Sequence, residues 1–259
     1  MRILAIGDIV GERAAKKIEE ELPKIRKEEK IDFVIANAEN AYKGNGLSKE
    51  LYNQIINSGV DVITMGNHTW GNEEIYDILK EDNIIRPANI TKGIQGKGYT
   101  ICKHGQTKIA VINLIGRQYM QGVYYPNNPF TEIQDILEKI DKNVKIKIID
   151  FHAQGTGEKF VLAYFLDGKV SAVYGTHTHV QTADDQILAK GTGFITDIGM
   201  TGAIQSDLGC NPEDGIKRNL MDLKIPDRMS ENPIQISGCI FEIDDETGLT
   251  IKTKRINKR

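Results

Sequence analysis

Three short apolar segments near the N-terminus decide the fold: RILAI at residues 2–6, DFVIA at residues 32–36 and DVITM at residues 61–65. Short runs of this kind, rich in Ile and Val and bounded by polar residues, are typical of buried β-strands. Because helical patterns separate them, the strands are expected to lie parallel in one sheet. The sequence therefore predicts an α/β fold.

The segments between these strands carry helix signals. Ala14–Glu29 has a charged helical pattern, in which Pro23 can introduce a kink. Ser48 can cap a second helix, which Gly59 ends. Asn72 can cap a third helix that extends to Lys80. These helices are expected to cover the parallel sheet.

The second half of the chain is richer in strands. Helices are expected near Thr131–Ile140 and Glu158–Leu166. Met200–Pro233 has little periodicity and is predicted to be a long irregular connection. The expected strands are Lys108–Leu114, Lys145–Phe151, Ser171–Gly175 and Gly193–Thr196, followed by a closing hairpin of Gly238–Ile243 and Leu249–Arg255. Because no linker or repeat divides the chain, we expect one domain over residues 1–259.

Composition excludes several classes of protein. The net charge of −3 gives no reason to expect a stable nucleic-acid complex or an anionic membrane surface as partner. No apolar run approaches the ~20 residues that a membrane-spanning helix needs, and the N-terminus does not resemble a signal peptide. Three scattered cysteines offer neither a disulfide framework nor a Cys-x-x-Cys metal site. We therefore expect a cytoplasmic protein.

Polar residues follow the predicted strands at the points where they end. Gly7-Asp8 follows the first strand, Asn37-Ala38-Glu39-Asn40 the second and Gly66-Asn67-His68 the third. Later strands end in Asp150-Phe151-His152 and Gly175-Thr176-His177-Thr178-His179. The carboxyl ends of parallel strands share one edge of a sheet, where ligands bind. Five strand ends are thus expected to direct their side chains toward one crevice.

The residue types in this set indicate a metal site. Imidazole, carboxylate and amide donors suit Mn, Fe or Zn, and the absence of thiolate argues against a site for soft metals. Four of the five histidines fall in the set, and His104 lies outside it in a turn-like segment that we interpret as solvated surface. Two divalent ions carry four positive charges, whereas Asp8 and Glu39 supply only two negative ones. Such a site favours an anion, and phosphate is the natural candidate.

Each residue also has a simpler interpretation when taken alone. Asp8 could cap a helix, Asn67 could form a turn, and His152 could be a hydrogen-bonded core histidine. Gly7-Asp8-Ile9-Val10-Gly11 could be mistaken for a dinucleotide-binding loop, but the third glycine is missing and an acidic residue stands where pyrophosphate would bind. Because these interpretations require independent coincidences at five strand ends, the metal site is favoured.

Several motifs resemble a known family. Gly-Asn-His at 66–68 and Gly-Thr-His-Thr-His at 175–179, together with Gly7-Asp8, resemble the calcineurin-like metallophosphoesterase superfamily. The fuller strings are more similar to its YmdB-type branch of bacterial cyclic-nucleotide phosphodiesterases, and the resemblance extends from Met1 to about Ile256. These strings are NAENA (37–41), TMGNHTWG (64–71), RPANI (86–90), GTHTHVQTAD (175–184) and ITDIGMTG (195–202).

The resemblance implies a fold, a cofactor and a set of roles. The fold would be a four-layer α/β/β/α sandwich of two mixed sheets flanked by helices, with two metal ions per subunit, iron or manganese. One ion would be held by Asp8, Glu39, Asn40 and His179, and the other by Glu39 as the bridging ligand, Asn67, His152 and His177. His68 would donate a proton to the leaving oxygen. Val10 stands where most of the superfamily has a histidine, and Asn40 takes over its place, as in the branch.

One segment departs from the branch. After His152 the branch has an acidic, serine-containing string, whereas this chain has Gln154-Gly155-Thr156-Gly157-Glu158-Lys159. The ligand is untouched, so the departure concerns substrate preference or oligomer contacts. Arg117 and Lys159 could contact phosphate, but we leave both out of the site because exposed basic residues usually do nothing specific.

The expected mechanism is attack of a metal-bridging hydroxide on the phosphorus of a cyclic or linear nucleotide phosphodiester, with His68 as the acid. The expected partner is thus a small-molecule phosphodiester, with a homo-oligomer left open. One alternative is a phosphomonoesterase or nucleotidase with the same metals. Another is a metal-containing regulatory protein that acts through partner contacts.

Overall fold

The three N-terminal apolar segments form neighbouring parallel strands in the computed structural model, which describes residues 1–91, 93–120, 125–222 and 224–259. These strands are β1 (Arg2–Ile6), β3 (Phe33–Asn37) and β4 (Val62–Thr64). The short strand β5 (Ile84–Ile85) continues the parallel arrangement beside β4. The parallel pairing expected from the sequence is therefore confirmed.

The C-terminal hairpin makes this first sheet mixed. It consists of β13 (Ile234–Ile243) and β14 (Thr250–Lys258), as predicted. β13 pairs antiparallel with β1, although more than 200 residues separate them, as in the pair Arg2 and Glu242. At its first two residues β13 also pairs with β12 (Met200–Ala203), which in turn pairs with the two-residue strand β2 (Asp8–Ile9).

A second sheet contains the strands from the middle of the chain. Its order is β10-β11-β9-β8-β7-β6, with a parallel centre and antiparallel outer strands. The strands are β6 (Tyr99–His104), β7 (Thr107–Ile115), β8 (Ile146–His152), β9 (Ala172–Thr176), β10 (Gln186–Ile187) and β11 (Gly193–Ile195).

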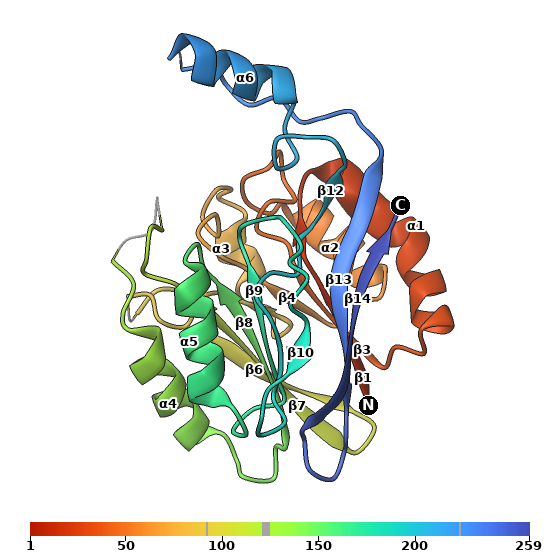
Figure 1. Cartoon of the computed structure of the whole chain (residues 1–259), viewed down its shortest axis with the longest axis vertical. Helices are drawn as coiled ribbons and strands as arrows, with labels where there is room; N and C mark the ends of the chain where they lie inside the picture. The colour runs from red at the N-terminus through yellow and green to blue at the C-terminus, as the bar shows by residue number, and fades with distance from the viewer. Residues whose placement is uncertain (92, 121–124, 223) are drawn as a thin grey trace.

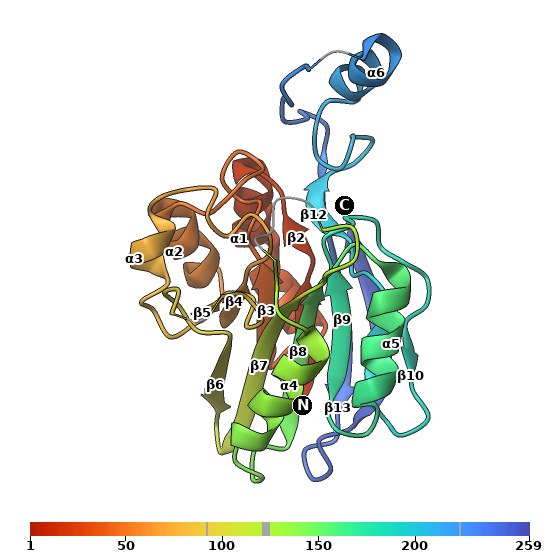
Figure 2. The same ribbon diagram turned by 90° about the vertical axis from the view of Figure 1, so that its left-hand side faces the viewer.

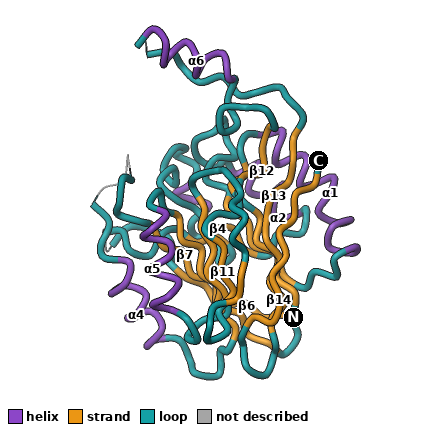
Figure 3. Tube along the Cα trace, viewed as in Figure 1, coloured by secondary structure: helices purple, strands orange, loops and turns teal. Residues whose placement is uncertain are grey.

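The two sheets pack face to face, and helices cover their outer faces (Figures 1 and 2). The apolar core between the sheets joins side chains of both, such as Ile35 and Phe241 from the first and Ile148 and Tyr174 from the second. α1 (Glu12–Glu28), α2 (Lys49–Asn57) and α3 (Ile75–Ile78) pack on the first sheet, and α4 (Pro129–Lys139) and α5 (Thr156–Leu166) pack on the second. Figure 3 shows the strands gathered between these helices. The four-layer α/β/β/α arrangement implied by the resemblance is therefore present.

Two predicted elements differ from the structure. The helix expected from Asn72 to Lys80 is limited to α3, because backbone bonds between residues three apart, such as Ile75 N to Asn72 O, form tight turns around it. The connection at Met200–Pro233, of which residue 223 lies outside the described residues, is less irregular than its sequence indicates, because it contains β12 and α6 (Pro212–Met221). Asn211 caps α6 by accepting from the backbone N of Glu213.

α6 projects away from the two sheets (Figures 1 and 2). Its apolar residues Ile216, Leu220 and Met221 are mostly exposed, so the helix lacks the buried stripe that identifies a core-packed helix in a sequence. Among the described residues, no helix has both the length and the apolar character that crossing a membrane requires.

Phe241 offers a test of the packing between the sheets. Its side chain is fully buried, and its ring lies 6.3 Å from that of Tyr174 across the interface. Phe241→Ala leaves a cavity there and is expected to lower the free energy of unfolding by about 3–5 kcal/mol in urea titration. The control Ile251→Ala, on the exposed face of β14, is expected to change it by less than about 0.5 kcal/mol. Equal effects of the two substitutions would contradict this packing.

Candidate metal centre

The predicted site residues come from strand ends of both sheets. Asp8 opens β2 directly after β1, Glu39 and Asn40 follow β3, and Asn67 and His68 follow β4. In the second sheet His152 is the last residue of β8, and His177 and His179 follow β9. The prediction of one shared sheet edge is therefore wrong in one respect, because two sheets contribute. Their parallel strands end on the same side of the sandwich, so the residues still meet.

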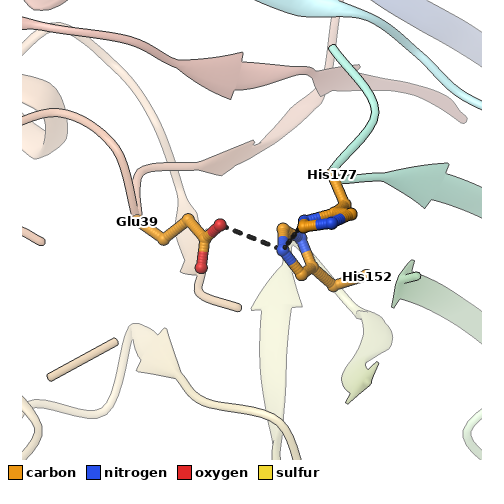
Figure 4. A group of neighbouring side chains, drawn as sticks. All are labelled: Glu39, His152 and His177. Carbon is orange, nitrogen blue, oxygen red and sulfur yellow. Dashed lines mark hydrogen bonds and ion pairs between the residues drawn. The ribbon is translucent and has the colours of Figure 1, made fainter. Parts of the chain in front are cut away.

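His152 lies at the centre of the cluster. Its Nε2 atom is 2.9 Å from Glu39 Oε1, 2.8 Å from Asn67 Oδ1 and 3.1 Å from His177 Nδ1. Ligand atoms of Glu39, His152 and His177 all lie within 4.8 Å of one another, and their side chains point toward a common centre (Figure 4). One carboxylate and two imidazoles from different sheets thus converge on one small volume.

Hydrogen bonds behind His152 determine which ring nitrogen faces this volume. The Thr176 hydroxyl donates to Asp150 Oδ1 at 2.7 Å. Its single hydrogen is then used, so at 2.9 Å from His152 Nδ1 it accepts the hydrogen of that ring nitrogen. Nε2 of the neutral ring therefore carries a lone pair that faces the oxygens of Glu39 and Asn67. Lone pairs at hydrogen-bond distance repel one another unless a proton or a metal ion lies among them.

A second group of residues surrounds Asp8. Asp8 Oδ2 accepts from the backbone N of His177 at 3.2 Å, whereas its buried Oδ1 has no hydrogen-bond partner among the described residues. His179 Nε2 is 3.8 Å from this Oδ1 and 3.3 Å from Asn40 Nδ2. An unpaired buried carboxylate oxygen beside imidazole is suited to binding a cation.

The electrostatics of the cluster favour bound cations. Burial raises the pKa of Asp8 to about 7 and also raises the pKa of Glu39. Burial lowers the pKa of His152 to about 3 and also lowers the pKa values of His177 and His179. Metal binding requires ionised carboxylates and neutral imidazoles, and a cation stabilises both of these forms. The donor set therefore fits the metal ions that the sequence implied.

His68 lies at the rim of the cluster. Its side chain is 41% exposed, and its backbone N donates to Glu39 Oε2 at 2.8 Å. His68 Nδ1 is 2.6 Å from Asn40 Oδ1. Because an amide oxygen can only accept, Nδ1 carries the hydrogen of this bond. Nε2 is then the ring atom that remains available to a molecule bound at the rim.

The His177-Thr178-His179 loop has an unusual backbone. His177 has φ 94° and His179 has φ 64°, both in the left-handed region that non-glycine residues rarely adopt. Residues hold such conformations where surrounding contacts over-determine them, and they cluster at functional sites. The two turns direct both imidazoles into the cluster from one short segment.

The structure also corrects one prediction about a basic residue. Lys159 is not the exposed residue that its sequence context suggests, because it is 1% exposed and its Nζ lies 2.8 Å from Asp197 Oδ2.

Three buried residues support the cluster, although no single motif indicated this role: Asp150, Thr176 and Asp197. Asp197 and Thr176 lie inside strings that carried the family resemblance, and this was the available signal.

Comparisons with known proteins agree with this fold. The family model of YmdB-like proteins matches residues 4–256. The chain is 44% identical to the 2′,3′-cyclic-nucleotide 2′-phosphodiesterase of Bacillus subtilis over 257 residues, which cover 99% of this chain and 96% of that one.

Two crystal structures are also similar over nearly the whole chain. A novel phosphatase from Mycoplasma pneumoniae has a TM-score of 0.94 at 33% identity, with 99% of this chain and 92% of that chain covered. A protein from Thermus thermophilus has a TM-score of 0.93 at 34% identity, with 99% and 98% covered.

The fold and these relatives define the class as a phosphoesterase enzyme of the metallophosphoesterase type. Within that class, the chain belongs to the YmdB-like family. The seven predicted ligands lie in one cluster, and their assignment to particular ions is taken up below as a proposal.

Gly66 tests how tightly the cluster is packed. A Cβ atom at this position would lie 2.4 Å from Glu39 Oε2 and 2.4 Å from His152 Nε2. Gly66→Ala is therefore expected to displace both side chains and to reduce the bound metal by at least about one ion per chain, measured by elemental analysis. Gly157→Ala is the control, because the added Cβ would meet no atom within 4 Å beyond its neighbours in α5. Normal metal content in Gly66→Ala would contradict the proposed ligand positions.

Proposed function

We propose that the protein is a dinuclear-metal phosphodiesterase that hydrolyses cyclic nucleotides. The observation that carries the proposal is the convergence of potential metal-ligand atoms from both sheets on one buried volume, led by His152 Nε2 and by Asp8 Oδ1, which has no hydrogen-bond partner among the described residues. The activity named for the Bacillus subtilis relative supports 2′,3′-cyclic nucleotides as the substrate class. The 3′,5′-cyclic isomers are the second class to be tested.

Two ions divide the seven residues between them in this proposal. Asp8, Asn40 and His179 would hold one ion, Asn67, His152 and His177 would hold the other, and Glu39 would be a ligand of both. When bound, such ions supply Lewis-acid chemistry, because they offset the charge that develops on the phosphoryl oxygens and lower the pKa of water. Nitrogen and oxygen donors without thiolate suit iron or manganese.

The remaining residues bind and orient the substrate. The site stays electropositive because two carboxylates do not neutralise two divalent ions, so it attracts the phosphodiester anion. His68 is held by its bond from Nδ1 to Asn40, which directs Nε2 toward the rim. In the protonated ring, Nε2 donates its hydrogen to the departing ribose oxygen. By analogy with the Bacillus subtilis relative, which is named a 2′-phosphodiesterase, this would be the 2′ oxygen.

A panel of substrates tests the proposal. Purified protein with its metal content measured is incubated with 2′,3′-cyclic AMP, 3′,5′-cyclic AMP and the 3′- and 5′-monophosphates. We expect 2′,3′-cyclic AMP to be hydrolysed fastest and its product, the 3′-monophosphate, to accumulate. The Mycoplasma pneumoniae relative is described as a phosphatase, which makes a phosphomonoesterase the second candidate. Release of phosphate from the monophosphates alone would favour that candidate.

His68→Ala separates acid catalysis from metal binding. The substitution removes the proton donor but none of the proposed ligands, so the metal content is expected to stay at the wild-type value. Turnover of 2′,3′-cyclic AMP is expected to fall by about 10²–10⁴-fold. An ester with a good leaving group, such as bis(p-nitrophenyl) phosphate, needs less protonation and should lose much less. Equal losses on the two substrates would argue against a role as acid.

A further inference from the structure

A buried ion pair lies behind the loop that carries His177 and His179. Lys159 comes from α5 on the outer layer, and Asp197 follows β11. Their side chains are 1% and 0% exposed, and Lys159 Nζ lies 2.8 Å from Asp197 Oδ2. A fully buried lysine is rare because removing its charge from water is costly. A buried ion pair offsets this cost only when further hydrogen bonds satisfy its remaining polar atoms.

Asp197 makes those contacts with two neighbouring loops. Its Oδ2 accepts from the Thr178 hydroxyl at 2.6 Å and from the Thr178 backbone N at 3.2 Å. Its Oδ1 accepts from the backbone N of Gly199 at 2.8 Å. Thr178 stands between His177 and His179, and Gly199 precedes Met200, which pairs with Asp8 in the first sheet. One carboxylate thus fixes the backbone beside three of the proposed ligands.

The path of the Lys159 side chain depends on Gly175. A Cβ atom at Gly175 would lie 2.8 Å from both Lys159 Cδ and Lys159 Cε. The absence of a side chain at the end of β9 therefore lets the lysine stem pass beneath the loop and reach Asp197. This arrangement joins the outer helix to the centre of the site.

The ion pair also affects the net charge of the side chains around the proposed ions. All the hydrogen-bond partners of the Asp197 carboxylate are donors, so its oxygens are already engaged. Lys159 offsets its negative charge, which leaves Asp8 and Glu39 as the carboxylates that face the proposed ions. Asp197 can therefore anchor the loop without acting as a further ligand.

We propose that Lys159, Asp197 and Thr178 form a positioning unit that holds the left-handed turns at His177 and His179 in the geometry that binds metal. None of the three touches the substrate in this proposal, which rests on the metal centre proposed above. The hydroxyl of Thr178 is the part best suited to a test, because replacing it changes neither charge nor a ligand.

Thr178→Val removes that hydroxyl and keeps the shape of the side chain. Mn²⁺ is titrated into metal-free protein and followed by calorimetry, with Tm measured on the same samples. We expect the dissociation constant for Mn²⁺ to rise by about 10–100-fold, as is common when an outer partner of a ligand is lost. Thr178→Ser keeps the hydroxyl and is expected to restore affinity to within a few fold of the wild type.

Thr250→Val is the matched control. The Thr250 hydroxyl likewise makes a short hydrogen bond, donating to Ser171 O at 2.7 Å, but Thr250 is buried near the opposite end of β9. This variant is expected to lower Tm without changing Mn²⁺ affinity. If Thr178→Val also lowered Tm without changing Mn²⁺ affinity, the Thr178 hydroxyl would only stabilise the fold, and the proposal would be overturned.

The double variant Lys159→Met with Thr178→Val tests whether the lysine acts through the same contact. Because both substitutions release the same loop, their effects on Mn²⁺ affinity are expected to be far from additive. Additive losses would remove Lys159 from the unit. Wild-type protein that bound no Mn²⁺ or Fe²⁺ would overturn the metal centre and this proposal together, whereas normal binding by Thr178→Val would overturn this proposal alone.

Discussion

The structure depends on the packing of two sheets whose parallel strands end on the same side. At that junction Glu39 from one sheet meets His152 from the other, with 2.9 Å between Oε1 and Nε2. Both side chains are buried, and burial disfavours the charged form of each. Such a contact is stable only if a positive charge is shared between them. A proton can supply part of that charge, but a metal ion satisfies more of the surrounding donors.

The same constraint accounts for the supports around the cluster. Asp150 fixes the His152 ring through Thr176, and Asp197 fixes the loop of His177 and His179. Both carboxylates are fully buried, and each accepts from several donors. Polar groups in an apolar core are costly unless every one is satisfied, so these networks permit few alternative arrangements. The resulting rigidity is what a site needs if it must hold ions at fixed positions.

Much of this arrangement could be predicted from the sequence, because a short local pattern is enough to identify the end of a strand. An apolar run followed by Gly-Asn-His or Gly-Thr-His-Thr-His identifies both the strand and the residues that leave it. The division of those strands between two sheets could not be predicted from their patterns, since both sheets consist of similar apolar runs. α6 was missed because its apolar residues face away from any core, and β12 because four residues are too few to establish a period. The burial of Lys159 could not be predicted because it depends on Asp197, which lies 38 residues further along the chain.

The position of β13 has a consequence for how the protein is made. β13 pairs with both β1 and β12, and β12 pairs with the strand that contains Asp8, so this part of the sheet is incomplete until residues 234–243 have been synthesised. The contact between Asp8 and His177 itself spans 169 residues. Contacts so distant in the chain carry a large entropic cost and form late in folding. The nascent chain is therefore expected to have no finished site for the proposed ions before residues 234–243 are free to pair.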